Sequence, residues 1–315
     1  LEEVLREPCA PGERASVLRL LAEISHHDDS FDEAARLLRD ALRLAEGPEL
    51  KGAIELGLSY VESNLMDWGA ALRHARRALD HARASGNALL EAQALAYRAM
   101  MGFLVGRGAD WRSVERAIAL EGPDPLAPLV GRPALIEALL RLYVGEHDLA
   151  RAALHRLAAE AVGRGDESDV AFVLLWLSWL ETRAGRFAEA SRLAAEAAAL
   201  ARLTGSVSMH AWVLTQRAYV AAHTGDAEEV RGRCAEATAP VQASGRLLPG
   251  LWTAAALALL ELSLGDAEAA ARACEPALAA LERRGIGEPV PAFFLPDALE
   301  ALVAIGERER ARRLV

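Results

Sequence analysis

The chain contains 315 residues, of which 52% are hydrophobic, and it carries a formal net charge of −10 at pH 7. This acidic balance argues against direct binding of nucleic acid, because phosphate backbones attract clusters of lysine and arginine. The only lysine is Lys51, so the chain has no GxxxxGK[ST] loop of the kind that binds nucleotide phosphates. Schiff-base chemistry would have to use this one residue.

Four similar turns recur at a fixed interval. Gly145, Gly185, Gly225 and Gly265 follow one another at intervals of 40 residues, and each precedes a short, mostly polar segment and then an alanine or a valine. Such a period identifies a repeat array, in which each unit packs only against its neighbours. The equivalent turn positions of the other repeats are Asp29, Met66, Ala109 and Gly306.

Each turn position separates two apolar-periodic stretches that we expect to be helices, named here helix A before the turn and helix B after it. In the B helices, inward-facing residues recur at spacings of three and four. The fifth residue after the turn is alanine or valine in the first seven repeats, which lets helices A and B approach closely. These residues are Ala34, Ala71, Val114, Ala150, Ala190, Val230 and Ala270.

The ends of several helices are also predicted. Glycines are expected to end B helices where the backbone turns left-handed. Aspartates directly after a turn glycine are expected to cap the next helix. The glycines are Gly86, Gly205, Gly245 and Gly285, and the aspartates are Asp226 and Asp266.

Proline-rich segments interrupt this repeat pattern twice. Four prolines within 122–133 predict an extended seam between the third and fourth repeats. One continuous solenoid would then comprise repeats one to three at 1–121, the seam at 122–133, and repeats four to eight at 134–315. Pro296 is expected in the first turn of a short last A helix. Because the chain starts at Leu1 and stops within a repeat, we expect it to be a fragment of a longer protein.

The cysteines and the apolar runs favour a cytoplasmic protein. Cys9, Cys234 and Cys274 form no CxxC pair. The last two hold the same position in successive repeats, which favours small buried side chains over a disulfide or a metal site. No secretory signal opens the chain. The apolar run at 170–180 is about half as long as the ~20 residues that span a membrane, so no membrane contact is expected.

The turn GRFAEA at 185–190 resembles that of tetratricopeptide repeats, whose period is 34 rather than 40. HEAT repeats have periods near 40, but their turn lacks this pattern. The long-period variety is similar to the sensor region of MalT-like, LuxR-type transcription regulators, which carry an N-terminal ATPase, a helical-repeat middle and a C-terminal helix-turn-helix domain. The stretch 295–314, LPDALEALVAIGERERARRL, resembles the last repeat of that middle region.

The resemblance implies an all-α, right-handed superhelical solenoid of tetratricopeptide-like repeats. It further implies a regulatory sensor that binds a protein or small-molecule inducer and controls assembly of the ATP-bound homo-oligomer. The ATPase and DNA-binding domains would flank this region in the same chain, and no cofactor is expected within it. The alternative is a stand-alone tetratricopeptide adaptor that binds a protein or peptide. We expect no enzyme, because the sequence offers no recognisable nucleophile, base and orienting acid.

Aromatic residues share two positions on the later A helices, thirteen and six residues before the turn. In tetratricopeptide arrays the A helices line the concave side, so this register predicts a ligand groove with a few polar contacts. The first position holds Phe172, Trp212, Trp252 and Phe293, and the second holds Trp179 and Tyr219. The candidate groove residues are Phe172, Trp179, Arg183, Trp212, Thr215, Tyr219, His223 and Trp252.

Two interpretations of this stripe stay open. Aromatic residues at helical spacing are also typical of core packing between neighbouring A helices. A core role predicts a large loss of stability when a ring is removed, whereas a binding role predicts a folded protein that has lost its ligand. No metal site is expected: the segment 26–29, HHDD, fits helix capping and solvation better than metal ligation.

Overall fold

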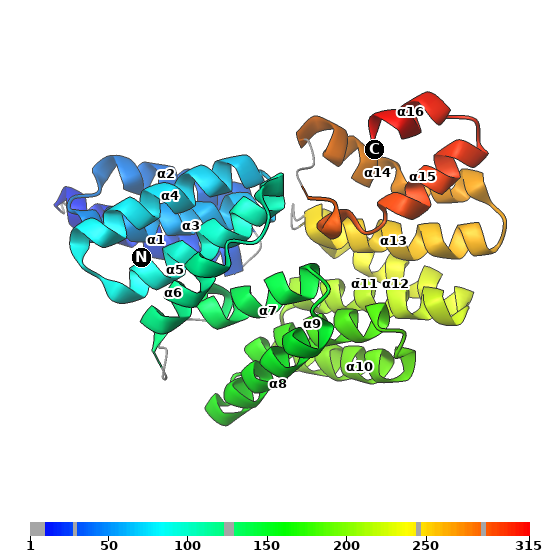
Figure 1. Ribbon diagram of the computed structural model, residues 1–315, viewed down its shortest axis with the longest axis horizontal. Coiled ribbons are helices and arrows are strands. Elements are labelled where there is room, and N and C mark those ends of the chain that lie inside the picture. The colour runs from blue at the N-terminus through cyan, green and yellow to red at the C-terminus, as the bar shows by residue number, and fades with distance from the viewer. Residues whose placement is uncertain (1–9, 28–29, 123–128, 244–246, 285–287) are drawn as a thin grey trace. The chain divides into compact units, whose positions relative to one another are not determined.

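The computed structural model describes residues 10–27, 30–122, 129–243, 247–284 and 288–315 (Figure 1). Within these ranges every regular element is helical, and A and B helices alternate along the chain. The A helices are α1 (Pro11–His27), α3 (Pro48–Asn64), α5 (Ala88–Gly102), α7 (Pro133–Tyr143), α9 (Glu167–Arg183), α11 (Val207–Thr224), α13 (Leu247–Ser263) and α15 (Leu295–Ala304). The B helices are α2 (Phe31–Leu44), α4 (Trp68–Ser85), α6 (Trp111–Glu121), α8 (His147–Arg164), α10 (Phe187–Leu203), α12 (Ala227–Ala243), α14 (Ala267–Arg284) and α16 (Arg308–Arg313).

The all-α solenoid of tetratricopeptide-like helix pairs is thereby confirmed. A helices pack against the B helices that follow them, as in the pairs α3–α4 and α9–α10, and successive A helices such as α11 and α13 also touch. Three short elements complete the described chain: the π-helix η2 (Phe103–Arg107) and the 3₁₀ helices η3 (Leu129–Gly131) and η4 (Val290–Ala292).

The predicted turn positions are the residues at which the backbone becomes left-handed. Positive φ angles occur at Gly145, Gly185, Gly225, Gly265 and Gly306. In the second repeat Met66 takes this conformation with φ 59°, which is unusual for a residue with a side chain. The left-handed residue lets the chain leave helix A while the last carbonyls of that helix are still hydrogen-bonded.

The third turn was predicted wrongly at Ala109. There α5 continues into η2, and positive φ angles occur at Gly106 (81°) and Gly108 (74°). The π-helix adds residues between α5 and α6, so the turn is longer than in the other repeats and its glycines come earlier. The first predicted turn position, Asp29, lies outside the described residues.

The helix-end predictions are confirmed where the structure describes them. Gly86 and Gly205 have φ angles of 71° and 72° after α4 and α10, whereas Gly245 and Gly285 lie outside the described residues. The Asp226 carboxylate accepts a hydrogen bond from the backbone N–H three residues later at 2.9 Å, and that of Asp266 does so at 2.8 Å. Pro296 lies in the first turn of α15, where its missing N–H costs no helical bond.

The small residue five positions after the turn is at the contact between helices A and B. All seven predicted residues are between 0% and 1% exposed. In two repeats the contact includes a hydrogen bond, because Ser59 donates to the carbonyl oxygen of Ala71 at 2.9 Å and Ser178 to that of Ala190 at 2.8 Å. Each serine stands seven residues before its turn, so helices A and B make the same close contact in both repeats.

Ion pairs join successive repeats at one register. The acidic partner is a glutamate four residues before the turn of helix A, and the arginine comes from the preceding B helix. The nitrogen–oxygen distances are 2.5 Å for Arg39–Glu62, 2.6 Å for Arg151–Glu181 and 2.9 Å for Arg231–Glu261. The sequence analysis missed these pairs because their partners are 23 or 30 residues apart.

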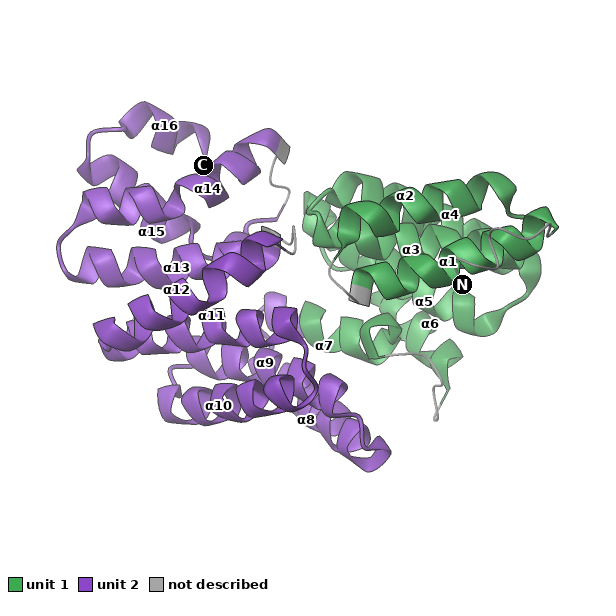
Figure 2. Cartoon of the chain, turned by 180° about the vertical axis from the view of Figure 1, so that it is seen from behind, with its two compact units in different colours: residues 1–140 green, residues 141–315 purple. Residues whose placement is uncertain are grey.

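The chain forms two compact units, unit 1 (residues 1–140) and unit 2 (residues 141–315), shown in Figure 2. The boundary lies within α7, after the predicted seam at 122–133. Most of α7, the A helix of the fourth repeat, therefore belongs to unit 1. The middle of the seam, 123–128, lies outside the described residues, so the predicted division at 121 and 134 stays a prediction.

One apolar helix and two of the cysteines lie in the interior of the structure. The segment Ala88–Arg107 is long and apolar enough by length and composition to cross a membrane, and 67% of its apolar 18-residue window is buried inside the structure. Cys234 and Cys274 are 3% and 0% exposed, which confirms their expected role as small buried residues. Burial raises the pKa of both thiols to about 12, so they are unreactive at neutral pH. Cys9 lies outside the described residues.

We expect the Gly185→Ala variant to be less stable than the parent chain by about 1–2 kcal/mol, because a Cβ disfavours the left-handed backbone. An added Cβ meets no atom within 4 Å there, so the loss would come from the backbone alone. The matched control is Gly163→Ala inside α8, where a Cβ also meets nothing within 4 Å and helix propensity predicts a gain of about 1 kcal/mol. Urea unfolding of both variants tests the opposite signs, and equal shifts would contradict the assignment of the turn.

Candidate functional site

The predicted aromatic stripe is largely buried. Four of its eight residues are closed off from solvent, so they do not line an open groove. Their exposed fractions are 1% for Trp179, 4% for Trp212, 0% for Thr215 and 1% for Trp252. Phe172 and Tyr219 are half-buried, whereas Arg183 and His223 are exposed.

These rings meet because helices from non-adjacent repeats approach one another inside unit 2. Trp176 of α9 lies 6.0 Å from Trp212 of α11 and 5.8 Å from Trp252 of α13, measured between ring centroids. Phe293, just before α15, lies 5.7 Å from Trp179. The shared register was therefore predicted correctly. The A helices of unit 2 approach one another so closely, however, that the rings fill the space between them and form an aromatic core.

Trp176 was missed, although its ring lies within 6.3 Å of five other rings of this core. It stands nine residues before its turn, outside the two positions that the other aromatic residues share. Its ring lies 6.3 Å from Phe172, 6.2 Å from Tyr143 and 6.0 Å from Trp179. Trp176 lies one helical turn after Phe172 on the same face of α9, and this spacing is the signal that would have predicted it.

The polar residues of the stripe lie at the edge of this core or inside it. Arg183 places its guanidinium 5.0 Å from the centroid of the Trp179 ring, a cation–π contact. His223 stacks on Phe187 at 5.2 Å and touches Tyr219 at 4.8 Å. Partial burial lowers the pKa of His223 and raises that of Tyr219 to about 12, so both are neutral at pH 7. The buried Thr215 hydroxyl donates to its own helix at 2.7 Å.

A buried polar link also joins α9 to α11. The Gln216 amide nitrogen donates to the Ser178 hydroxyl at 2.8 Å and to the Thr182 hydroxyl at 3.0 Å. All three side chains are buried. Such a network fixes how the two A helices α9 and α11 pack against each other.

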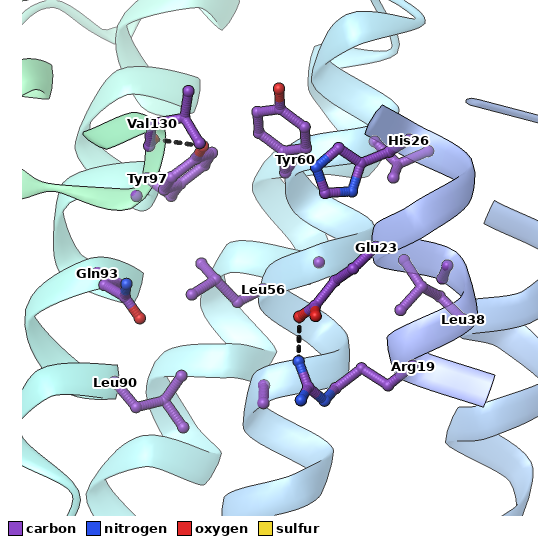
Figure 3. Close-up of a pocket in the computed structure, with 15 residues that line it drawn as sticks. Arg19, Glu23, His26, Leu38, Leu56, Tyr60, Leu90, Gln93, Tyr97 and Val130 are labelled. Atoms are coloured by element: carbon purple, nitrogen blue, oxygen red, sulfur yellow. Dashed lines mark hydrogen bonds and ion pairs between the residues drawn. The ribbon is translucent and has the colours of Figure 1, made fainter. Parts of the chain in front are cut away.

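The open candidate site is a pocket on the A helices of unit 1 (Figure 3). It lies among the A helices α1, α3 and α5, with Leu38 of α2 and η3 completing its lining, and has a volume of about 210 Å³. Its floor is mostly apolar, and its polar groups come from all three A helices. The lining residues that Figure 3 labels are Arg19, Glu23, His26, Leu38, Leu56, Tyr60, Leu90, Gln93, Tyr97 and Val130.

A row of three rings forms one end of this pocket. The centroids of His26 and Tyr60 are 5.2 Å apart, and those of Tyr60 and Tyr97 are 6.4 Å apart. The Tyr97 hydroxyl donates a hydrogen bond to the Val130 carbonyl oxygen at 2.9 Å, which ties η3 to α5. Burial raises the pKa of Tyr97, so its phenol stays protonated and the tie persists at all ordinary pH values.

The remaining polar groups of the pocket are an ion pair and an amide. Arg19 and Glu23, four residues apart on α1, pair with each other and so neutralise their charges. The Gln93 side chain points into the pocket from α5 (Figure 3). Its amide nitrogen would lie 2.9 Å from a Cβ added at Gly131, so a glycine in η3 keeps room for this amide.

The pocket was not predicted from the sequence, although one signal for it was present. Tyr60 stands six residues before its turn, the same position as Trp179 and Tyr219 in unit 2. His26 and Tyr97 do not share that register, and only the fold brings them beside Tyr60. Among the described residues no group of three His, Cys, Asp or Glu side chains is arranged to hold a metal ion.

No protein-family model and no curated protein sequence matches the chain. Its structure is similar to that of a Rap protein complexed with Competence and Sporulation Factor, with a TM-score of 0.65 and 14% identity over 96% of this chain and 97% of that chain. It is also similar to aspartyl phosphate phosphatase F from Bacillus subtilis, with a TM-score of 0.57 and 10% identity over 97% and 92% of the two chains. A tetratricopeptide repeat protein from Parabacteroides merdae aligns with a TM-score of 0.42 and 16% identity over 91% and 100%. At these identities the likeness concerns the fold.

Proposed function

We propose that the chain is the regulatory sensor and protein-interaction region of a cytoplasmic, LuxR-type, ATP-dependent transcription regulator. Its inducer or partner binds the pocket among α1, α3 and α5 of unit 1 and thereby controls oligomerisation. The observation that carries this proposal is the open pocket itself, which combines an apolar floor with a few convergent polar groups, as ligand sites do. The resemblance of 295–314 to the last repeat of such regulators supports the family.

The pocket is a better candidate than the predicted stripe because its walls are open. In unit 2 the corresponding A-helix surface is filled by the rings of Trp179, Trp212 and Trp252, each at most 4% exposed. A ligand would have to displace packed rings there, whereas Leu56, Tyr60 and Gln93 are accessible as they stand. A Rap protein of similar fold forms a complex with Competence and Sporulation Factor, which supports a binding role for this architecture.

A binding role also fits the chemistry of the pocket better than a catalytic one. One structure of similar fold is named a phosphatase. Here the two charged residues of the pocket, Arg19 and Glu23, pair with each other, so neither is poised as a free acid or base. The alternative function is a stand-alone tetratricopeptide adaptor that binds a protein or peptide in the same pocket. An ATP-binding loop upstream and a helix-turn-helix downstream in the full gene would favour the regulator.

We expect the Leu56→Trp variant, whose larger side chain fills the pocket, to abolish ligand binding. The test is thermal unfolding with a library of sugars, metabolites and short peptides. A ligand at 100 times its dissociation constant adds about 2.7 kcal/mol to the free energy of unfolding. The control is Leu149→Trp, a residue of α8 that is 54% exposed and does not line the pocket. A ligand that stabilises both variants equally would contradict the proposed site.

A further inference from the structure

The pocket shares part of its lining with a second depression, which we name the acidic groove. It is lined by Glu46, Gly47, Pro48, Glu49 and Leu50 around the start of α3 and by Ala84 and Ser85 at the end of α4. Arg19 and Ala53 line both the pocket and the groove, so the two are continuous. The groove has the larger volume of the two, about 800 Å³ against 210 Å³.

The charges along this path are unbalanced. Arg19 is paired with Glu23 where the pocket meets the groove. Glu46 and Glu49 are exposed, and neither forms an ion pair with any residue in the described ranges. Glu49 accepts a hydrogen bond at 2.8 Å from the neutral Asn87 amide. Two carboxylates are therefore available to a cation that enters the groove.

The pocket has the opposite character. Its floor is apolar, formed among others by Leu38, Leu56 and Leu90, and its one ion pair is neutral as a whole. An engineered apolar cavity of about 150 Å³ holds a benzene molecule. A pocket of 210 Å³ is therefore large enough for one aromatic ring or branched aliphatic side chain, but too small for a whole drug-sized ligand.

We propose that pocket and groove together bind a ligand in which an apolar side chain lies next to a positively charged group. The apolar part enters the pocket beside Leu56, and the cation is held by Glu46 and Glu49. This inference rests on the site of the proposed function and names its ligand class. Two sources carry this chemistry: a peptide segment with an apolar residue next to lysines or arginines, and a small arylalkyl amine. The Gln93 amide, which both donates and accepts hydrogen bonds, favours the peptide because it can pair with a peptide group.

The test is isothermal titration of the 315-residue chain with four probes at low ionic strength. The probes are acetyl-Phe-Lys-Lys-amide, acetyl-Ala-Lys-Lys-amide, acetyl-Phe-Glu-Glu-amide and phenethylamine. We expect the first to bind at least about tenfold more tightly than the second, which lacks the apolar side chain, and than the third, which carries like charge. Its affinity should also fall as salt is added. If phenethylamine binds as tightly as the first peptide, the small amine is the ligand and the Gln93 argument fails.

A charge-neutral variant tests the groove directly. In Glu46→Gln/Glu49→Gln both carboxylates are replaced by amides of the same shape, and we expect affinity for acetyl-Phe-Lys-Lys-amide to fall about three- to tenfold. The matched control is Asp80→Asn/Glu115→Gln, which removes two exposed carboxylates of unit 1 that line neither depression. Equal affinity of the two double variants would overturn the proposal.

Failure of this inference can be told from failure of the proposed function. If an acidic or neutral probe binds and Leu56→Trp abolishes that binding, the site is real and the proposed ligand class is wrong. If basic probes bind but Leu56→Trp has no effect, both the ligand class and the placement in the pocket are wrong. If no probe shows binding that depends on Leu56, Glu46 or Glu49, the inference is overturned, while the library screen still decides the proposed function.

Discussion

Replacing Trp179 by alanine is expected to lower the free energy of unfolding by about 3–5 kcal/mol. The side chain is 1% exposed. Its ring lies 6.1 Å from Tyr143, 6.2 Å from Trp252 and 5.7 Å from Phe293, so it contacts residues of three other segments of unit 2. Removing it leaves a cavity that those segments can close only by moving together. Urea unfolding followed by circular dichroism measures the loss.

Phe172→Ala is the matched control for this prediction. Phe172 belongs to the same helix, α9, but its ring is half-buried and contacts Trp176 and Trp212 at the edge of the aromatic core. We expect a loss of about 1–2 kcal/mol, because less apolar surface returns to water. If Trp179→Ala is as stable as the parent chain, the ring is not core, and the interpretation of the stripe as a ligand groove would be revived.

The periodic features of the fold could be predicted from the sequence because they are local. A left-handed turn residue and a small residue five positions later recur along the chain, and a capping aspartate follows some of the turns, as at Gly225, Val230 and Asp226. Each depends on backbone geometry within one helical turn. The turn of the third repeat was predicted wrongly because η2 lengthens α5. No residue pattern in the sequence indicates this π-helix.

The aromatic stripe is a feature whose role could not be predicted from local sequence patterns. Its register places Trp212 and Trp252 on the same face of successive A helices, and the structure confirms that arrangement. Whether this face is a groove or a core depends on the small rotation between repeats, which accumulates over α9, α11 and α13. That rotation follows from long-range contacts, such as the link from Gln216 to Ser178, which periodicity cannot reveal.

The pocket was missed for a related reason. Its polar residues come from three repeats and differ in register, since His26, Gln93 and Arg19 occupy unrelated positions relative to their turns. Each alone is an ordinary exposed or half-exposed helix residue. Only the packing of α1, α3 and α5 places them around one cavity, and only the start of α3, with the residue Glu46 before it and Glu49 in its first turn, adds two carboxylates to the adjoining groove.

Replacing Glu121 by alanine is expected to cost about 3–5 kcal/mol of stability, because it removes one partner of a buried ion pair. Glu121 ends α6 and accepts a hydrogen bond from Nε of Arg132 at 2.8 Å, and the two side chains are 3% and 5% exposed. The second carboxylate oxygen accepts from the Ala134 backbone N–H in the first turn of α7 at 3.1 Å. One side chain thus joins the residues on both sides of the proline-rich segment.

Two further variants separate this role from a general effect of charge. Glu309→Ala removes the acidic partner of Arg312 in a pair whose side chains are 77% and 71% exposed, and we expect a change below about 0.5 kcal/mol. The double variant Glu121→Leu/Arg132→Met replaces the buried pair by apolar side chains of similar size and should recover most of the loss. A small effect of Glu121→Ala in urea unfolding would mean that α6 and α7 are held together by other contacts. If the double variant does not recover the lost stability, the hydrogen bond from the Ala134 backbone N–H to Glu121, rather than the ion pair, stabilises this part of the fold.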